Sequence, residues 1–200
     1  MIKNIIFDLG NVLLDFNPRG YLKEKIQDDA IDDVYEAVFK SEEWPMLDRG
    51  VITEEDAKRN ILVRNKKYET EIIKAFENWY ELLQPIKITV EILEMLKKKG
   101  YKIYYLSNFH SAAFDYVTDH YEFFKLFDGG VVSYAEKLLK PEREIYIKLI
   151  ERYNLIPEES IFIDDTLENV KGAEMCRIKG IYLNNGNKLK EKLLELDINV

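Results

Sequence analysis

Polar side chains that can bind a cation or donate hydrogen bonds to an anion follow short apolar runs in this sequence. The runs are apolar on successive residues, which is typical of strands buried on both faces of a parallel sheet. Because ligands bind at the carboxyl ends of strands in open α/β sheets, we expect the residues after the runs to converge. These residues are Asp8, Ser107, Asn108, Lys140, Asp164 and Asp165.

These residue types favour phosphoryl chemistry. Carboxylates brought together need a cation, since otherwise at least one of them must stay protonated. Magnesium takes oxygen ligands and accepts one or two carboxylates, a carbonyl and waters, with a substrate phosphate completing the set. Asp8 can then serve as both ligand and nucleophile. Lys140 would balance the negative charge, and Ser107 with Asn108 would donate to the phosphoryl oxygens.

Taken singly, the same residues have ordinary structural explanations. An aspartate at the end of a strand often forms a turn or caps a helix, and Asp164 and Asp165 could cap the helix that begins near Leu167. A Ser-Asn pair after a strand often caps the next helix in the same way. The site is favoured because all of these residues fall at one edge of a single predicted sheet.

The elements that would position these residues are strands that alternate with helices. Strand, helix and strand repeated in this way predict right-handed crossovers and an α/β, Rossmann-like, doubly wound parallel sheet. The predicted strands cover 5–7, 103–106, 130–132, 161–163 and 180–183, and the helices 90–99, 112–121, 142–153 and 169–177.

The stretch from Asp15 to Gln84 breaks this alternation. It is helical by spacing at 21–25, 32–39, 54–62 and 68–83, and Thr53 is the expected N-cap of the third of these helices. We therefore expect a helical cap subdomain over residues 15–85, inserted into an α/β core made of residues 1–14 and 86–200. Such an insertion can form a lid over a pocket.

Four segments, in order, resemble the motifs of the haloacid dehalogenase (HAD) superfamily. They are IIFDLGNVLLD, YYLSN, LKPEREIY and SIFIDDTLENVKGA. The insertion lies where that superfamily has a helical cap of the C1 type. The DLGNV form of the first motif is similar to a branch that includes bacterial α-glucose-1-phosphate phosphatases.

The resemblance implies roles for the matching positions. Asp8 would be the nucleophile and a magnesium ligand, with Asp165 and the backbone carbonyl of Gly10 as further ligands. Asp164 would neighbour these ligands without coordinating the metal itself.

Three more positions take roles from the same resemblance. Ser107 would bind the transferred group, and Lys140 would be the lysine of the third motif. Asn169 would orient Lys140 or Asp165.

Gly10 departs from the pattern of the superfamily's phosphatases, which usually carry a second aspartate at this position as the general acid and base. Such catalysis is typically worth about 10²–10⁴-fold in rate. Either the substrate has a good leaving group or another residue supplies the proton, with His110 and Asp15 as candidates.

In the insertion, the string WPMLDRGVIT brings Trp44, Asp48 and Arg49 close together. Arg49 and Asp48 could reach into the pocket and contact sugar hydroxyls or a carboxylate, and Arg49 is our predicted substrate-binding residue. In the alternative interpretation, Asp48 and Gly50 shape a turn and Trp44 packs inside the cap.

We therefore expect a magnesium-dependent phosphomonoester phosphatase that acts on a small phosphorylated metabolite, such as a sugar phosphate, through an aspartyl-phosphate. One alternative is a 2-haloacid dehalogenase that uses the same Asp8. Dehalogenases of the superfamily also lack the second aspartate and need no metal, but they typically have Thr or Ser where this chain has Val12. A non-catalytic binding or sensor homologue is the third possibility.

Charge, hydropathy and cysteine content indicate which classes of binding partner and which compartment to expect. The net charge of −8 argues against nucleic acid, and no segment approaches the roughly 20 apolar residues that cross a bilayer. The single cysteine, Cys176, fits a buried hydrophobic position and a reducing compartment. We expect a cytoplasmic protein, and its oligomeric state stays open.

Overall fold

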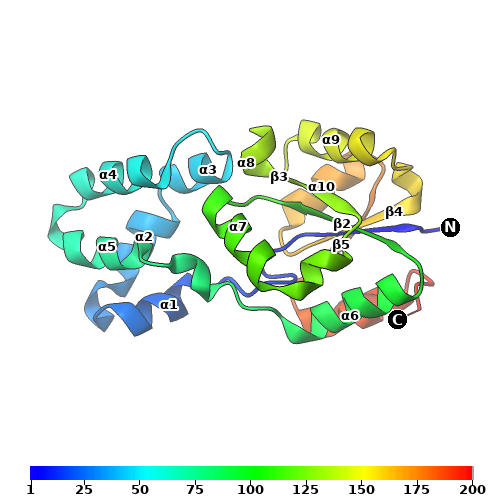
Figure 1. Ribbon diagram of the computed structural model, residues 1–200, viewed down its shortest axis with the longest axis horizontal. Helices are drawn as coiled ribbons and strands as arrows, with labels where there is room; N and C mark the ends of the chain where they lie inside the picture. The colour runs from blue at the N-terminus through cyan, green and yellow to red at the C-terminus, as the bar shows by residue number, and fades with distance from the viewer. Residues whose placement is uncertain (200) are drawn as a thin grey trace.

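The computed structural model describes residues 1–199, and a parallel sheet of five strands lies at its centre (Figure 1). The strand order is β3-β2-β1-β4-β5, with β1 paired to both β2 and β4. This arrangement confirms the predicted doubly wound α/β core. The strands are β1 (Asn4–Phe7), β2 (Lys102–Ser107), β3 (Gly129–Val132), β4 (Ser160–Asp164) and β5 (Lys179–Tyr182).

Helices cover both faces of the sheet because alternate side chains of each strand point to opposite sides. The core helices are α6 (Lys87–Lys98), α7 (Ser111–His120), α8 (Ser133–Glu136), α9 (Arg143–Tyr153), α10 (Leu167–Met175) and α11 (Leu189–Leu194). Ile5 and Phe7 pack into the larger apolar cluster with α6 and α11, whereas Ile6 packs into the smaller one with α9 and α10.

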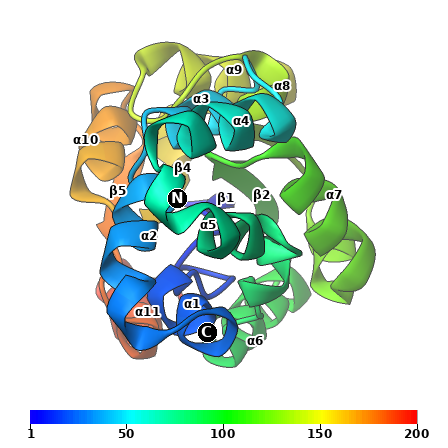
Figure 2. The ribbon, with the colours of Figure 1, turned by 90° about the vertical axis from the view of Figure 1, so that its left-hand side faces the viewer.

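The segment between β1 and α6 forms a separate group of helices, which we call the insert (residues 15–85). Strand β1 runs toward it, so the carboxyl ends of the strands face the insert (Figures 1 and 2). Its two connections to the core lie side by side, with Asp15 N donating to Gln84 O at 2.7 Å and Ile86 N to Leu13 O at 2.8 Å. The helices of the insert are α1 (Pro18–Lys25), α2 (Ile31–Phe39), α3 (Glu43–Asp48), α4 (Glu54–Arg64) and α5 (Glu69–Phe76).

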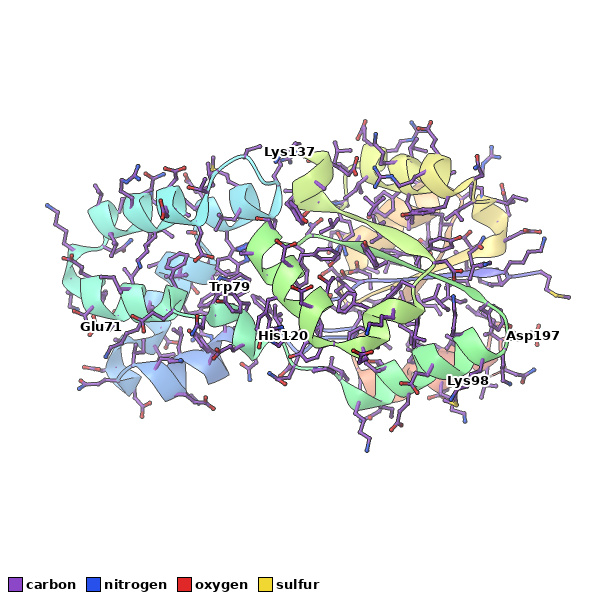
Figure 3. All side chains as sticks on the ribbon, in the orientation of Figure 1. Glu71, Trp79, Lys98, His120, Lys137 and Asp197 are labelled. Atoms are coloured by element: carbon purple, nitrogen blue, oxygen red, sulfur yellow. The ribbon has the colours of Figure 1, made fainter. Side chains whose placement is uncertain are left out.

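Local signals account for two features of the insert. The predicted cap at Thr53 is confirmed, since its hydroxyl accepts from Asp56 N at 3.1 Å. The single helix predicted over 68–83 is wrong. Helix α5 ends at Phe76, since Glu77 is extended (φ −72°, ψ 104°) and Asn78 then adopts a left-handed conformation (φ 54°), which asparagine tolerates better than most residues. A short 3-10 helix, Trp79–Leu82, follows and carries Trp79 to the junction with the core (Figure 3).

Two smaller expectations can be compared with the structure. Cys176 is buried, as predicted for a small apolar side chain. Within residues 1–199, no helix has the length and apolar character required to cross a membrane.

Candidate active site

The residues predicted from the strand ends do converge. Phe7 of β1 is in register with Tyr105 of β2 and Ile163 of β4, so the residues that follow these strands meet at one edge. Asp8, Asp164 and Asp165 each bring one carboxylate oxygen within 4.8 Å of the others.

Lys140 lies at the centre of this acidic group. Its Nζ is 2.8 Å from Asp8 Oδ1 and 2.6 Å from Asp164 Oδ2, and its side chain is only 1% exposed. Burial opposes the charged form of the lysine, but the carboxylates of Asp164 and Asp8 outweigh it and raise the pKa of Lys140. The ammonium therefore stays charged and compensates for part of the negative charge.

The two oxygens of Asp8 have different surroundings. Oδ1 accepts from Ser107 Oγ at 2.6 Å and from Leu9 N at 2.8 Å, in addition to its contact with Lys140. Within residues 1–199, no donor contacts Oδ2. Burial, more than any neighbouring charge, raises the pKa of Asp8 to about 7. One oxygen of the carboxylate is thus held in place while the other is free to react or to bind a cation.

Asp164 and Asp165 are adjacent in sequence but differ in their contacts. Asp164 is fully buried and accepts from Asn169 Nδ2 at 3.1 Å and Thr166 N at 2.7 Å, besides Lys140 Nζ. Asp165 is half-buried, and its Oδ2 accepts from Asn11 Nδ2 at 3.0 Å. The oxygens of Asp164 are therefore occupied by Lys140 and its other donors, whereas Asp165 still has lone pairs that can bind a cation.

Asn108 lies beside Lys140 but uses its side chain on the backbone. Its Oδ1 accepts from Lys140 N at 2.8 Å, and its Nδ2 donates to Lys140 O at 3.1 Å. This pair of bonds fixes the loop that carries Lys140.

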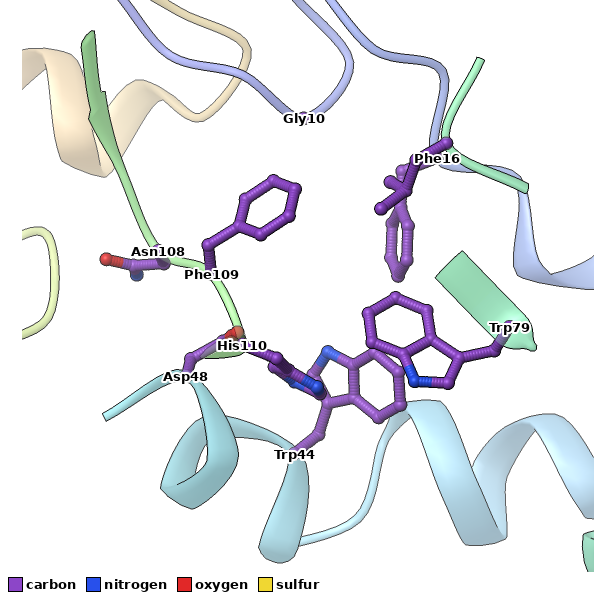
Figure 4. Close-up of a pocket in the computed structure, with 9 residues that line it drawn as sticks. Gly10, Phe16, Trp44, Asp48, Trp79, Asn108, Phe109 and His110 are labelled. Carbon is purple, nitrogen blue, oxygen red and sulfur yellow. Dashed lines mark ion pairs between the residues drawn. The ribbon is translucent and has the colours of Figure 1, made fainter. Parts of the chain in front are cut away.

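A cavity of about 110 Å³ opens beside these groups, between the core and the insert (Figure 4). Most of its wall is aromatic or aliphatic. The centroid of the Trp44 ring lies 4.9 Å from the ring centroid of Trp79 and 4.4 Å from that of His110. Its polar groups are the carboxyl of Asp48, the amide of Asn108, the imidazole of His110 and the indole N–H groups of the two tryptophans. The lining residues are Gly10, Phe16, Trp44, Asp48, Trp79, Leu83, Asn108, Phe109 and His110.

Of the three remaining candidate residues, only His110 lines the cavity. Arg49 forms an ion pair with Glu142 of the core and donates to Lys137 O at 3.1 Å; it does not line the cavity. His110 does line it, but burial lowers the pKa of this imidazole to about 3, so the ring is neutral. Asp15 is exposed and lies outside the cavity.

Sequence reasoning missed two residues of the site. Asn11 adopts a left-handed conformation (φ 54°) and bonds Asp165, a contact between residues 154 positions apart. Ser133 accepts from Phe109 N at 2.9 Å and donates to Asp48 O, which joins three segments. The position of Asn11 directly after Gly10 was the only sequence signal available for it.

Comparison with known proteins shows which family this chain belongs to. The family model of haloacid dehalogenase-like hydrolases matches residues 2–176. A sesquiterpene phosphatase from Aspergillus oryzae is 30% identical over 182 residues, covering 90% of this chain and 89% of the relative. A phosphorylated carbohydrates phosphatase from Thermotoga maritima is 26% identical, covering 94% of this chain and 89% of the relative.

A solved structure extends the likeness to the fold. A HAD family enzyme from Bacteroides thetaiotaomicron, in complex with magnesium and inorganic phosphate, is 26% identical with a TM-score of 0.69, covering 90% of this chain and 93% of that one. The ordered strand-end residues, the parallel sheet and these matches lead to one conclusion. The chain is a hydrolase and belongs to the haloacid dehalogenase-like family.

Proposed function

We propose that this chain is a magnesium-dependent phosphomonoester phosphatase that acts through an aspartyl-phosphate on Asp8. The observation that carries the proposal is the asymmetry of the Asp8 carboxylate. Three donors hold Oδ1, while Oδ2 has none within residues 1–199, and one carboxylate oxygen each of Asp8, Asp164 and Asp165 lies within 4.8 Å of the others.

The donor set fits a hard divalent cation. Three carboxylates with one lysine leave two negative charges uncompensated, and burial raises the pKa of both Asp8 and Asp165. Asp8, Asp165 and the carbonyl of Gly10 would hold magnesium, which prefers oxygen ligands. When bound, the ion would stabilise the negative charge on the phosphoryl oxygens.

The protein's own residues would then perform the displacement. Lys140 and the Ser107 hydroxyl orient the carboxylate and can donate to the transferred group. The Asp8 carboxylate attacks phosphorus through one oxygen, and the bond to the leaving oxygen breaks. Water then hydrolyses the aspartyl-phosphate, which releases phosphate and regenerates Asp8.

The apolar wall of the cavity narrows the substrate class. An engineered cavity of about 150 Å³ lined by Leu, Ile and Phe accepts benzene, so about 110 Å³ suits a compact apolar group. A hexose would bury several hydroxyls against Phe16, Trp44 and Trp79, and an unpaired buried hydroxyl costs about 1–3 kcal/mol. We therefore propose a monoester whose alcohol is apolar next to the ester oxygen. The related sesquiterpene phosphatase supports this class, and the related carbohydrate phosphatase does not.

The two alternatives have less support. Dehalogenases of the superfamily need no metal, and a buried acidic cluster with two uncompensated charges would then have no purpose. A non-catalytic homologue would not need a carboxylate with one oxygen held and the other free.

The test measures phosphate release from benzyl, isopentyl, glycerol and α-glucose-1-phosphate esters, with magnesium or with a chelator. Chloride release from 2-chloropropionate is measured in parallel, with Asp8→Asn as the control. We expect magnesium-dependent hydrolysis, fastest with the benzyl and isopentyl esters. Chloride release without a metal would favour the dehalogenase, and the absence of both activities would favour the non-catalytic homologue.

A further inference from the structure

A phosphate monoester of an ordinary alcohol needs a proton on its leaving oxygen, since an alkoxide is a poor leaving group. At Gly10 the chain has no side chain to supply it. A Cβ placed there would meet nothing within 4 Å, so the space is open. We propose that Asp48, which the insert carries into the cavity, donates this proton; the inference rests on the proposed phosphatase activity.

Asp48 is in the right place. It is the only carboxyl group among the residues that line the cavity, and Gly10 and Asn108 line the same cavity (Figure 4). Asp48 is the last residue of helix α3, so the insert contributes its carboxyl group to the cavity that Gly10 of the core also lines, and we place the leaving group of the ester in this cavity.

The carboxyl group of Asp48 is also in a suitable chemical state. Its side chain is 19% exposed, and its Oδ1 lies 3.2 Å from His110 Nε2 without forming a hydrogen bond. Burial raises the pKa of Asp48 to about 7, with Lys140 lowering it and Asp8 raising it. His110 is neutral and does not compensate a charge on Asp48. Much of the carboxyl therefore carries a proton near neutral pH.

Contacts on either side of Asp48 hold it against the core. Ser133 Oγ donates to Asp48 O, and Arg49 pairs with Glu142. Lys137 Nζ donates to Gly50 O (Lys137 is labelled in Figure 3). Gly50 has φ +67°, and a Cβ there would lie 2.6 Å from the carbonyl oxygen of Tyr134. These bonds and the close approach at Gly50 fix this segment of the insert against the core.

The step balances in protons and electrons. Asp8 attacks phosphorus, the leaving oxygen keeps the bonding electron pair, and the Asp48 proton completes the alcohol. In the second step a water molecule attacks the aspartyl-phosphate and gives one proton to the Asp48 carboxylate. Asp8 leaves as a carboxylate, and both groups return to their starting states.

The other candidates are less suited to this task. His110 has a pKa lowered to about 3 and holds no transferable proton at neutral pH beyond that of the neutral ring. Asp15 is exposed and does not line the cavity.

The experiment compares p-nitrophenyl, phenyl and benzyl phosphate, in order of rising leaving-group pKa. Each ester has one ring, so the fit to the cavity is nearly constant. In Asp48→Asn we expect kcat for benzyl phosphate to fall about 10²-fold or more, whereas kcat for p-nitrophenyl phosphate changes little. Asp119→Asn, the same substitution at an exposed position, is the matched control. Equal losses for all three esters, or none, would overturn the proposal.

A second test moves the proton-donating carboxyl group from position 48 to position 10. Because a Cβ at Gly10 meets no neighbour, Gly10→Asp should restore benzyl phosphate hydrolysis to Asp48→Asn. Failure of this rescue in a folded double variant that still cleaves p-nitrophenyl phosphate would count against a proton-donor role.

The unmodified enzyme gives a third test that needs no variant. Its kcat should depend weakly on leaving-group pKa, and a steep dependence would exclude any donor. If the enzyme cleaves no ester at all, the phosphatase proposal itself fails, which is distinct from a phosphatase insensitive to Asp48.

Discussion

The Lys140 ammonium lies 2.8 Å from Oδ1 of Asp8, and both side chains are almost entirely removed from solvent. The contact leaves Oδ2 without a donor within residues 1–199, so the lysine orients the carboxylate without blocking it. A buried pair of this kind is held by further bonds, here donated by Lys140 to Asp164 and by Ser107 to Asp8.

Asp8→Asn should abolish phosphate release and leave the fold intact. The amide has nearly the same shape but is a poor nucleophile and a poor metal ligand. Acid-quenched unmodified enzyme should show a mass gain of one phosphoryl group by mass spectrometry, and the variant should show none. Turnover near the unmodified rate in the variant would place the nucleophile elsewhere.

Asp165→Asn and Asp164→Asn should have different effects although the residues are adjacent. Asp165→Asn removes a charge from the metal site and should raise the magnesium concentration needed for half-maximal activity. Asp164→Asn removes one of the two carboxylate partners of buried Lys140 and should lower the free energy of unfolding by up to about 3–5 kcal/mol. Magnesium titration and denaturant unfolding of both variants separate the two roles. A higher magnesium requirement in Asp164→Asn, with none in Asp165→Asn, would make Asp164 the ligand.

Stability should fall as pH rises when no magnesium is present. The pKa of Asp8 is raised from 3.8 to about 7 in the folded protein. Its contribution is therefore fully present below about pH 4 and is lost as pH rises through about 7. The fall between these values should be smaller in Asp8→Asn, measured by thermal unfolding in the presence of a chelator.

Magnesium should reverse this loss. A cation bound only by the folded state stabilises it, and it binds the ionised carboxylates. The rise in Tm on adding magnesium should therefore be larger at about pH 8 than at about pH 5. A rise of equal size at both values would mean that the ion binds elsewhere.

The role of Arg49 can be determined by comparing substitutions of Arg49 and of its ion-pair partner Glu142. Both side chains of the Arg49–Glu142 pair are about a third exposed, so the pair is worth at most about 1 kcal/mol. If Arg49 only holds the insert, Arg49→Gln and Glu142→Gln should have matching effects on KM and stability. If Arg49 binds substrate, as predicted from the sequence, only Arg49→Gln should raise KM.

Short-range patterns in the sequence determined the elements and most of the strand-end residues. Apolar runs predicted all five strands of the sheet, because a buried strand needs apolar side chains on both faces. The cap at Thr53 was also predictable, since the bond between its hydroxyl and Asp56 N depends only on neighbouring residues. Asp8 and Lys140 were found because parallel strands bring their carboxyl ends to one edge.

Only the tertiary structure decided which side chains meet. The cavity is made where the insert closes on the core, so Asp48 and His110 become neighbours across 62 positions of chain, as do Asn11 and Asp165 across 154. The same packing buries Asp8 and Asp48 and thereby raises the pKa of each to about 7. Hydrogen-bond geometry and desolvation depend on distances between residues far apart in the chain, and local periodicity carries no information about those distances.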